Sequence, residues 1–375
     1  MGGTLRARDA AQTLRWLEPV LKRCGVTRIA RVTGLDHVGI SVSMAVRPLA
    51  RTLSVSQGKG ISVELADASA AMESVELWHS ENAPAAVVVG SFTELAEQGH
   101  PVVDPVGLRP AGVFPGALDL RRRSTGWLDA ESLVSSRRHL VPRYLSAIAT
   151  DEVLLEHLAI LTNTTGLAGG NTLDEATCHA LCEVIERDAT ARFDALDASE
   201  QAAREILLES VTGPAAKLLE RLAEAGIGVR LWDQTSAVGV PAFGCTIQSN
   251  GELRGLGRFA GYGAHLDAEI AVSRAVSEAV QSRLTIIAGA RDDLPPTTYA
   301  AMQLSTADAL PASEATRRFE PTAAHTGSFA GDVRWLIERL TTAGFTEVLR
   351  VDLTRPELGV PVVIVFVPGA RMVLD

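Results

Sequence analysis

Residues Asn171–Phe193 have the sequence NTLDEATCHALCEVIERDATARF, and their spacing predicts a long helix over about 171–197. Thr172 followed by Glu175 matches a capping box, which places the start of the helix. Apart from a few charged positions, this segment is largely Ala, Leu, Val, Ile and Cys. We therefore expect most of its surface to be buried.

The charged positions of this helix share one face. With about 100° per residue and Glu175 at zero, His179 lies near about 40°, Glu183 near about 80° and Glu186 near about 20°. A solvated face normally alternates Lys with Glu, because like charges at these spacings repel, and here only Arg187 offers relief. Unpaired carboxylates are costly in a buried helix. The pattern favours carboxylates neutralised by bound cations over an ordinary solvated face.

Two further segments predict helices with a similar polar stripe. Residues 67–81, DASAAMESVELWHSE, and residues 268–284, AEIAVSRAVSEAVQSRL, each place three polar groups at i, i+4 and i+7, within about 60° of one another. In the second of these segments Arg283 points away from the stripe, and an intrahelical Arg–Glu pair would explain the segment on its own. The two stripes consist of Ser69, Glu73 and Glu76, and of Arg274, Glu278 and Gln281.

Three such stripes in one chain predict a shared site. Its carboxylates would repel both one another and any polyphosphate, so the site requires divalent ions, and oxygen ligands suit Mg²⁺. Arg187 and Arg274 would hold phosphate oxygens as bidentate donors. The carboxylates are Glu73, Glu76, Glu175, Glu183, Glu186 and Glu278.

Composition narrows the class of protein. The chain has 375 residues, of which 46% are hydrophobic and 21% are charged, and its net charge is -10. This acidic balance and an aromatic content of 5% argue against a nucleic-acid-binding surface. We see neither a signal peptide nor an apolar stretch long enough for a membrane, and the four cysteines form no CxxC pair. We expect a cytoplasmic protein that binds no nucleic acid and no membrane.

The coarse pattern predicts one α+β domain with mixed or antiparallel sheets packed against long helices. We expect an N-terminal helical extension over 1–26 and the main domain over 27–375. Helices are predicted over 10–24 and, at least one, within 199–225, and 293–320 is predicted as loop and short helix. Strands are predicted over 27–46, 85–92, 227–234 and 240–248, with 85–92 buried, and 126–145 contains hairpin material. The glycine-bearing segments SVSQGKGIS (54–62) and GLGRFAGYGAH (255–265) are predicted as loops that lead into helices. No fixed-period repeat is visible.

Three signatures resemble those of the YcaO family of ATP-dependent peptide-modifying enzymes. They are SVSQGKGISVELADASAAMESVELWHSE (54–81), GLAGGNTLDEATCHALCEVIERDA (166–189) and RAVSEAVQSRLTIIAGARDDL (274–294). The second is the most specific, because its Asn, three Glu and Arg match the family in both type and spacing. The resemblance extends from about Arg28 to the C-terminus.

The resemblance implies a YcaO-type domain with an ATP site that has no Walker motif. By position, it implies magnesium ligation by Glu73, Glu76, Glu175, Glu183, Glu186 and Glu278, and nucleotide contacts from Ser69, Asn171, Arg187 and Arg274. Gln281 is added to the nucleotide contacts because it shares the stripe of Arg274 and Glu278. No catalytic residue is identified. Lys59 and His179 are candidates, although an exposed loop lysine and a packed histidine explain them equally well.

The implied activity is ATP- and Mg²⁺-dependent activation of a backbone amide in a ribosomally synthesised precursor peptide. Family members give an azoline or thiazoline, a macrolactamidine, or a thioamide made with a TfuA-type partner protein, and a homodimer is a family expectation. The alternative is a non-catalytic protein of the same fold that presents the peptide to another enzyme.

Two departures from the family pattern bear on the product. The chain ends VFVPGARMVLD, with one proline where many azoline-forming members have a proline-rich tail, and Leu77 stands where many members have Arg. The three products remain open at this point. Since no separate peptide-recognition domain is evident, we expect leader binding to be absent or supplied by another chain.

Overall fold

The computed structural model describes residues 4–108, 120–146, 164–249, 256–290, 297, 310 and 313–371. Their contacts divide the chain into two compact units. Unit 1 comprises 1–74 and 192–325, and unit 2 comprises 75–191 and 326–375. The division falls inside helix α2 (Val63–Glu81) and inside helix α6 (Leu173–Asp194). Each unit combines helices with antiparallel strands, which confirms the predicted α+β class. The predicted boundary between residues 26 and 27 stays a prediction.

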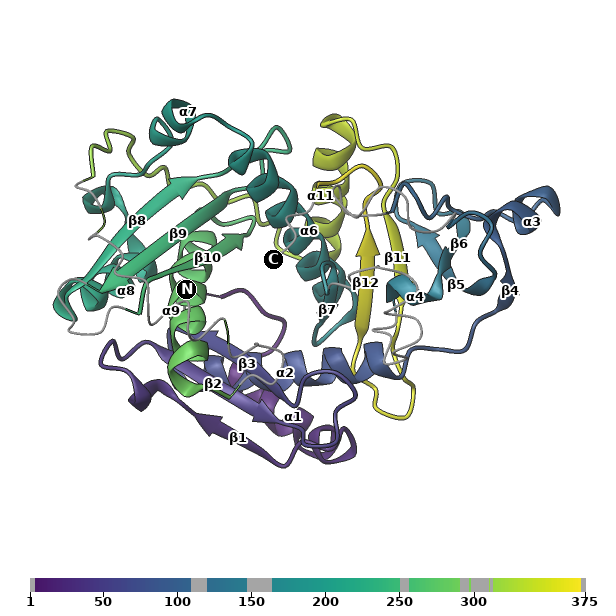
Figure 1. Cartoon of the computed structure of the whole chain (residues 1–375), viewed down its shortest axis with the longest axis horizontal. Coiled ribbons are helices and arrows are strands. Elements are labelled where there is room, and N and C mark those ends of the chain that lie inside the picture. Colours follow the sequence, from purple (N-terminus) through teal and green to yellow (C-terminus); the bar gives the residue numbers. More distant parts are fainter. Residues whose placement is uncertain are drawn as a thin grey trace. The chain divides into compact units, whose positions relative to one another are not determined.

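Unit 1 contains two three-stranded antiparallel sheets, and helix α9 (Ala268–Ala288) lies between them (Figure 1). Each sheet is a simple meander, in the orders β1-β2-β3 and β8-β9-β10. The apolar side chains of both sheets and of α9 form one buried core. The strands are β1 (Arg28–Arg31), β2 (Ser41–Val46), β3 (Val55–Gly60), β8 (Ile227–Asp233), β9 (Ala242–Ser249) and β10 (Arg258–Ala264).

The last strand of each sheet runs almost directly into a long helix, α2 after β3 and α9 after β10. The glycines in these strands allow backbones to touch. A Cβ atom added at Gly58 would lie 2.0 Å from the backbone nitrogen of Ala70, and one added at Gly263 would lie 2.2 Å from the carbonyl oxygen of Ala271. The loop predictions for 54–62 and 255–265 were therefore wrong over β3 and β10, because these glycines serve close strand–helix packing rather than a turn.

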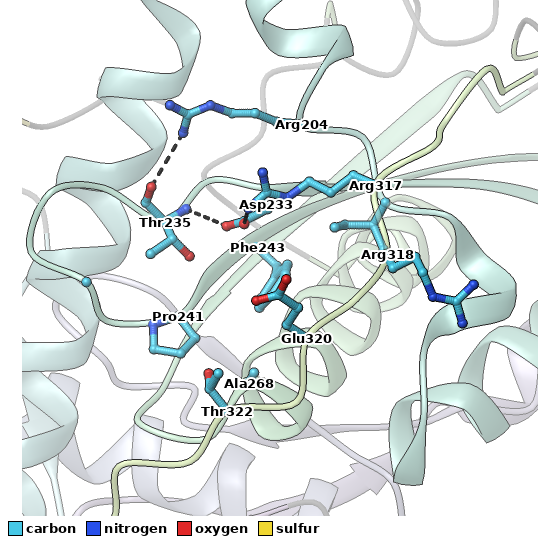
Figure 2. Close-up of a pocket in the computed structure, with 12 residues that line it drawn as sticks. Arg204, Asp233, Thr235, Pro241, Phe243, Ala268, Arg317, Arg318, Glu320 and Thr322 are labelled. Atoms are coloured by element: carbon cyan, nitrogen blue, oxygen red, sulfur yellow. Dashed lines mark hydrogen bonds and ion pairs between the residues drawn. The ribbon is translucent and has the colours of Figure 1, made fainter.

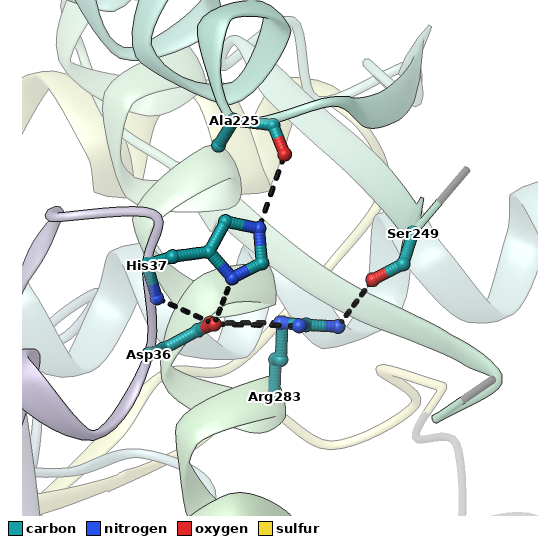
Figure 3. Close-up of polar contacts among 5 residues, drawn as sticks. All are labelled: Asp36, His37, Ala225, Ser249 and Arg283. Atoms are coloured by element: carbon teal, nitrogen blue, oxygen red, sulfur yellow. Dashed lines mark hydrogen bonds and ion pairs between the residues drawn. The ribbon is translucent and has the colours of Figure 1, made fainter. Parts of the chain in front are cut away.

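A buried ion pair connects α9 to the segment after β1. The guanidinium of Arg283 donates to Asp36 Oδ2 at 2.7 Å and to Ser249 Oγ at 2.7 Å, and the side chains of the pair are 2% and 3% exposed (Figure 3). His37 lies beside the same carboxylate, and its Nε2 lies 3.1 Å from the carbonyl oxygen of Ala225. Arg283 thus points away from the polar stripe of α9, as its spacing predicted.

Among the other described helices of unit 1, the one over Gly213–Glu224 packs on α9 and β8. The predicted helix over 10–24 is confirmed, and two helices occur between 198 and 225, where at least one was predicted. The predicted loop and short helix over 293–320 lie mostly outside the described residues. These elements are α1 (Ala10–Arg23), η1 (Thr33–Leu35), α7 (Ala198–Ala202), η2 (Leu208–Ser210) and α8 (Gly213–Glu224).

Unit 2 is built on a six-stranded antiparallel sheet of order β4-β5-β11-β12-β7, with β6 paired to β5. The predicted hairpin between 126 and 145 is present as the β5–β6 pair. The prediction that 85–92 is a buried strand was wrong in its burial, because β4 is an edge strand and Val89 is 69% exposed. The strands are β4 (Val88–Gly90), β5 (Thr125–Ser132), β6 (Arg138–Pro142), β7 (Leu167–Gly169), β11 (Leu349–Asp352) and β12 (Val362–Phe366).

Helix α6 starts directly after β7 and is tied to the sheet of unit 2. Thr172 Oγ1 accepts the N–H of Glu175 at 3.1 Å, which confirms the predicted start. Arg350 of β11 donates to Thr177 Oγ1 at 3.2 Å. Cys178 and Cys182 are buried, as their apolar-side positions predicted. The other helices are α3 (Phe92–Glu97), α4 (Arg143–Ser146) and α11 (Phe329–Thr342). Over the described residues, none of the helices combines the length and the apolarity needed to cross a bilayer.

Candidate functional site

The polar stripe predicted on α9 is its least buried side. Between Ala271 and Thr285 every side chain is buried except four, and all four are half-buried. Three of them are the predicted site residues Arg274, Glu278 and Gln281, and the fourth is Ser282. The polar side chains on the other sides of the helix, such as Arg283, are buried, so its accessible polar groups lie along this line.

Glu278 is held by donors from both sheets of unit 1. Lys59 Nζ of β3 donates to Glu278 Oε2 at 2.6 Å, and the two side chains are 21% and 22% exposed. The backbone N–H of Tyr262 in β10 donates to Glu278 Oε1 at 3.3 Å. Lys59 therefore contacts a predicted metal ligand and is not an exposed loop lysine.

The stripe on α2 has the same form as the stripe on α9. Ser69, Glu73 and Glu76 are half-buried, whereas Ala70 and Val75 are buried. Ser69 and Glu73 belong to unit 1 and Glu76 to unit 2. Within unit 2, Glu76 Oε1 accepts the N–H of Gly169, in the strand before α6, at 2.6 Å.

Helix α6 contains two deeply buried glutamates, one in its first turn and one in its second half. Glu175 is 1% exposed and Glu186 is 4% exposed. Asn171 Nδ2 donates to Glu175 Oε1 at 3.1 Å and to Oε2 at 3.2 Å. His179, Glu183 and Arg187 form a half-buried line at i, i+4 and i+8 on the same helix.

A buried histidine stands at the connection between β10 and α9. His265 Nδ1 accepts the N–H of Asp267, the N-cap residue of α9, at 3.0 Å. Burial, with the nearby positive charges of Arg274 and Arg6 as smaller causes, lowers the pKa of His265 to about 3. The ring is therefore neutral at physiological pH, and it orients the cap of the helix that carries the Arg274 stripe.

The donors along the three stripes fit a magnesium–polyphosphate group. They are carboxylate and amide oxygens with arginines among them, which suit Mg²⁺ and phosphate respectively. Gln281 Oε1 is buried and has no hydrogen-bond partner among the described residues. Within the described part of the chain, no three His, Cys, Asp or Glu side chains lie close enough together to hold an ion by themselves. Mg²⁺ usually keeps waters and substrate phosphates among its ligands, so a protein-only cluster is not required.

The structure joins some predicted residues directly and leaves the roles of the others as predictions. Lys59 meets Glu278 in unit 1, and Asn171 meets Glu175 in unit 2. Two backbone amides that hold site glutamates, those of Tyr262 and Gly169, were not predicted. Side-chain spacing gives no signal for a backbone donor. However, Tyr262 lies in the glycine-rich segment before α9, and Gly169 lies in the glycine-rich segment before α6.

Comparison with known families gives one match over most of the chain. The family model described as YcaO cyclodehydratase, ATP- and Mg²⁺-binding, matches residues 57–371. ATP and Mg²⁺ are thus the cofactors of the matched family, as the resemblance implied. Residues 54–56, at the start of the first signature, lie just outside this match.

Several curated relatives share more than 30% identity with the chain. An uncharacterised protein encoded in the tfuA 3′ region of Rhizobium leguminosarum bv. trifolii is 33% identical over 384 residues, which covers 98% of this chain and 89% of the relative. An uncharacterised protein of Mycobacterium tuberculosis (strain H37Rv) is 38% identical over 305 residues and covers 79% of this chain. The match spans 65% of the length of that second relative.

Solved structures share the fold over nearly the whole chain. The YcaO protein of Methanopyrus kandleri bound with AMPPCP and Mg²⁺ has a TM-score of 0.72 and 26% identity, and the match covers 98% of this chain and 93% of that one. A heterocyclase in complex with substrate and cofactor has a TM-score of 0.78 and 23% identity, and the match covers 98% of this chain and 53% of that one.

Proposed function

This chain belongs to the YcaO family, and from that premise we propose that it uses Mg²⁺–ATP to activate a backbone amide of a ribosomally synthesised peptide. A nucleophile adds to the amide carbon, the former carbonyl oxygen takes the terminal phosphoryl group of ATP, and that oxygen leaves as phosphate. ATP is needed because an amide oxygen is otherwise a poor leaving group.

One observation carries the proposal. The long helices α9 and α6 are buried on nearly every side, yet each keeps a line of half-buried charged groups. Carboxylates and guanidinium groups placed in such a line are the donors that Mg²⁺ and phosphate oxygens respectively take in proteins. The sequence match to an ATP- and Mg²⁺-binding family names those ions.

The roles of the individual residues follow from their chemistry. The glutamates would hold Mg²⁺, and Arg274, Arg187, Ser69, Asn171 and Gln281 would contact the nucleotide. Mg²⁺, when bound, shields the phosphate charge that develops during transfer. Lys59 Nζ is 2.6 Å from Glu278 Oε2, so it supplies a positive charge at the same carboxylate. The catalytic assignments of Lys59 and His179 remain candidates.

For the product, we propose a thioamide formed with a TfuA-type partner protein. The support is the relative of 33% identity that is encoded in the tfuA 3′ region. We also propose that the chain acts in the cytoplasm, where ATP and the precursor peptide are made, and that it works as a homodimer. An azoline, a thiazoline or a macrolactamidine is the alternative outcome of the product test below.

The metal-site assignment is tested by Glu183→Gln and Glu186→Gln. Each should abolish peptide-dependent phosphate release while thermal unfolding shows that the fold persists. The matched control is Glu224→Gln, since Glu224 is an exposed residue of α8. Full activity in both α6 variants would refute the assigned roles. Calorimetry shows whether the protein binds ATP with Mg²⁺. A non-catalytic partner would show no peptide-dependent phosphate release.

The product is tested by mass spectrometry of candidate peptides incubated with ATP, Mg²⁺, a sulfide source and a TfuA-type protein. Exchange of oxygen for sulfur at a backbone amide is the expected result. Loss of water would instead identify an azoline or an amidine, and it would contradict the thioamide assignment while leaving amide activation in place.

A further inference from the structure

A polar pocket lies in unit 1, and the predicted nucleotide and metal residues are not part of its lining. It has a volume of about 410 Å³ and contains none of the residues of the three stripes (Figure 2). Its walls come from the end of β8, the β8–β9 connection, the start of α9 and the extended segment 313–325. We call this segment the strap.

The strap is fixed to the body of unit 1 at several points, so the pocket is preformed. The N–H of Leu207 donates to the carbonyl oxygen of Arg317 at 2.8 Å. The N–H of Ala268 donates to the carbonyl oxygen of Thr322, also at 2.8 Å. Between them the ring of Phe319 packs on Phe243, with ring centroids 5.8 Å apart. A ligand would therefore meet a shaped wall and would not have to order this segment first.

The charges of the pocket are only partly paired. Asp233 is paired, because Oδ2 accepts from Arg317 Nη2 at 2.6 Å and Oδ1 accepts the N–H of Thr235 at 2.9 Å. Arg204 directs one of its five donors to the carbonyl oxygen of Thr235 at a long 3.4 Å. Across the described residues, Arg318 and Glu320 have no hydrogen bond or ion pair, and in Figure 2 Arg318 points away from the Asp233–Arg317 pair.

We infer that this pocket binds a carboxylate group of the peptide substrate, an inference that rests on the proposed function. The lining contains three arginines and two acidic residues, so its formal charge is +1, which suits a monoanion. The planar fork of Arg204 suits the two oxygens of a carboxylate. Phe243, Pro241 and Ala268 supply an apolar wall for the carbon chain that carries the carboxylate.

Glu320 restricts the choice of anion. Its carboxylate lines the pocket and would repel a second negative charge, which disfavours a phosphate dianion relative to a carboxylate. It also offers an acceptor for a backbone N–H of the same peptide. The carboxylate has two sources in a peptide, an acidic side chain or the C-terminus, and both have the required chemistry.

The test uses the full-length protein and short fluorescein-labelled peptides built from Gly, Ser, Ala and Leu. One peptide has a free C-terminal carboxylate, one has a C-terminal amide, and one has the amide with a single internal Glu. Fluorescence anisotropy should show at least tenfold tighter binding for one of the carboxylate peptides than for the amide peptide. Tighter binding of the peptide with the free C-terminus identifies the C-terminal carboxylate as the source, and tighter binding of the Glu peptide identifies an acidic side chain. Equal binding of all three peptides overturns the inference.

Variants assign the effect to the pocket. Arg204→Met should remove most of the preference, Arg204→Lys should keep part of it, and Arg318→Met should have a smaller effect. Arg15→Met on the exposed surface of α1 is the control and should bind like wild type. A preference that survives in Arg204→Met, with unfolding unchanged, overturns the assignment.

A fourth peptide tests the anion. Phosphoserine in place of the internal Glu should weaken binding to wild type, and Glu320→Gln should reduce that discrimination. Tighter binding of the phosphopeptide by wild type would contradict a carboxylate site. Calorimetry with Mg²⁺–ATP on the same preparation keeps the two claims apart. A carboxylate preference without ATP binding refutes the proposed function alone, and ATP binding without the preference refutes the pocket alone.

Discussion

The β3–α2 and β10–α9 segments of unit 1 share one construction and carry different polar groups. Gly58 is followed eight and twelve residues later by Ala66 and Ala70, and Gly263 at the same distances by Ala271 and Ala275. In each case a Cβ atom built on the glycine would clash with the backbone of both alanines. A three-stranded meander followed by a helix thus occurs twice, although no sequence period is visible.

The repeated construction places the polar stripes at equivalent positions. Counted from the glycine, Glu73 and Glu278 are both at the fifteenth residue, and Ser69 and Arg274 are both at the eleventh. At the eighteenth residue α2 has Glu76 and α9 has Gln281. The α2 stripe therefore carries two negative charges, whereas the α9 stripe is neutral. We propose from this difference that the α2 stripe mainly serves the metal and the α9 stripe the phosphates.

The two helices also differ in how they are anchored, and this gives the largest expected effect. Arg283→Met would leave Asp36 as a buried carboxylate without its partner, which typically costs about 3–5 kcal/mol. Chemical denaturation measures the loss.

The control for this anchor is Arg31→Met on the α2 side. Arg31 contacts Asp67 of α2 at 2.9 Å, but its side chain is 64% exposed. We expect only a small shift of its unfolding midpoint. A similar loss in both variants would contradict the difference between a buried and an exposed anchor.

Adding a methyl group at either glycine tests the repeated construction itself. Gly58→Ala and Gly263→Ala should each destabilise unit 1 by about 3 kcal/mol, since the new Cβ meets backbone atoms that cannot move aside locally. Thermal unfolding is the measurement. Gly34→Ala is the control, because nothing lies within 4 Å of a Cβ built there.

The proposed division between metal and phosphate is tested by Glu73→Gln and Arg274→Met. Each should raise the Kd for Mg²⁺–ATP at least about tenfold, or about 1.4 kcal/mol. Excess Mg²⁺ should restore binding in Glu73→Gln and not in Arg274→Met, as measured by calorimetry over a series of Mg²⁺ concentrations. Identical Mg²⁺ dependence in the two variants would contradict the division.

The smallest expected effect is on how the free energy of unfolding depends on pH. The strand–helix connection has His265 in β10–α9 and Gly60 at the equivalent position in β3–α2. The pKa of His265 is about 3 in the folded protein, against about 6.5 unfolded. Its contribution to stability is therefore complete above pH 6.5 and is lost as the pH falls towards 3, because the unfolded chain takes up the proton first. Between pH 7.5 and 5.5 the loss is about 1 kcal/mol.

Urea unfolding at these two pH values should show that His265→Asn loses less stability on acidification than wild type. His100→Asn, at an exposed position, should follow wild type. An unchanged pH dependence in His265→Asn would contradict the assigned role of the buried ring.

The sequence predicted the long helices well because their signals are local. The apolar spacing and the Thr172 cap of α6 lie within one segment, and so do the stripes of α2 and α9. The predicted stripe residues of α2 and α9 are all half-buried in the structure. The ATP and Mg²⁺ prediction and the YcaO assignment are confirmed by the family match.

What could not be predicted depends on contacts between distant segments. β3 and β10 were predicted as loops because glycine is normally depleted in strands, and only the packed helix explains its presence. Lys59 pairs with Glu278 across 219 residues, and Arg283 pairs with Asp36 across 247 residues. No local spacing links such partners. The individual roles of the site residues stay predictions.

The glycine contacts have a consequence for how this protein can vary. At Gly58 and Gly263 the strand meets the helix main chain to main chain, so the axial register of α2 and α9 does not depend on which apolar side chains fill the space around them. Volume-conserving exchanges among Val, Ile and Leu in the surrounding core should therefore be tolerated without sliding either helix. This gives one physical reason why chains with little identity can keep the same geometry, and it makes the two glycines fixed points for any redesign of the interior.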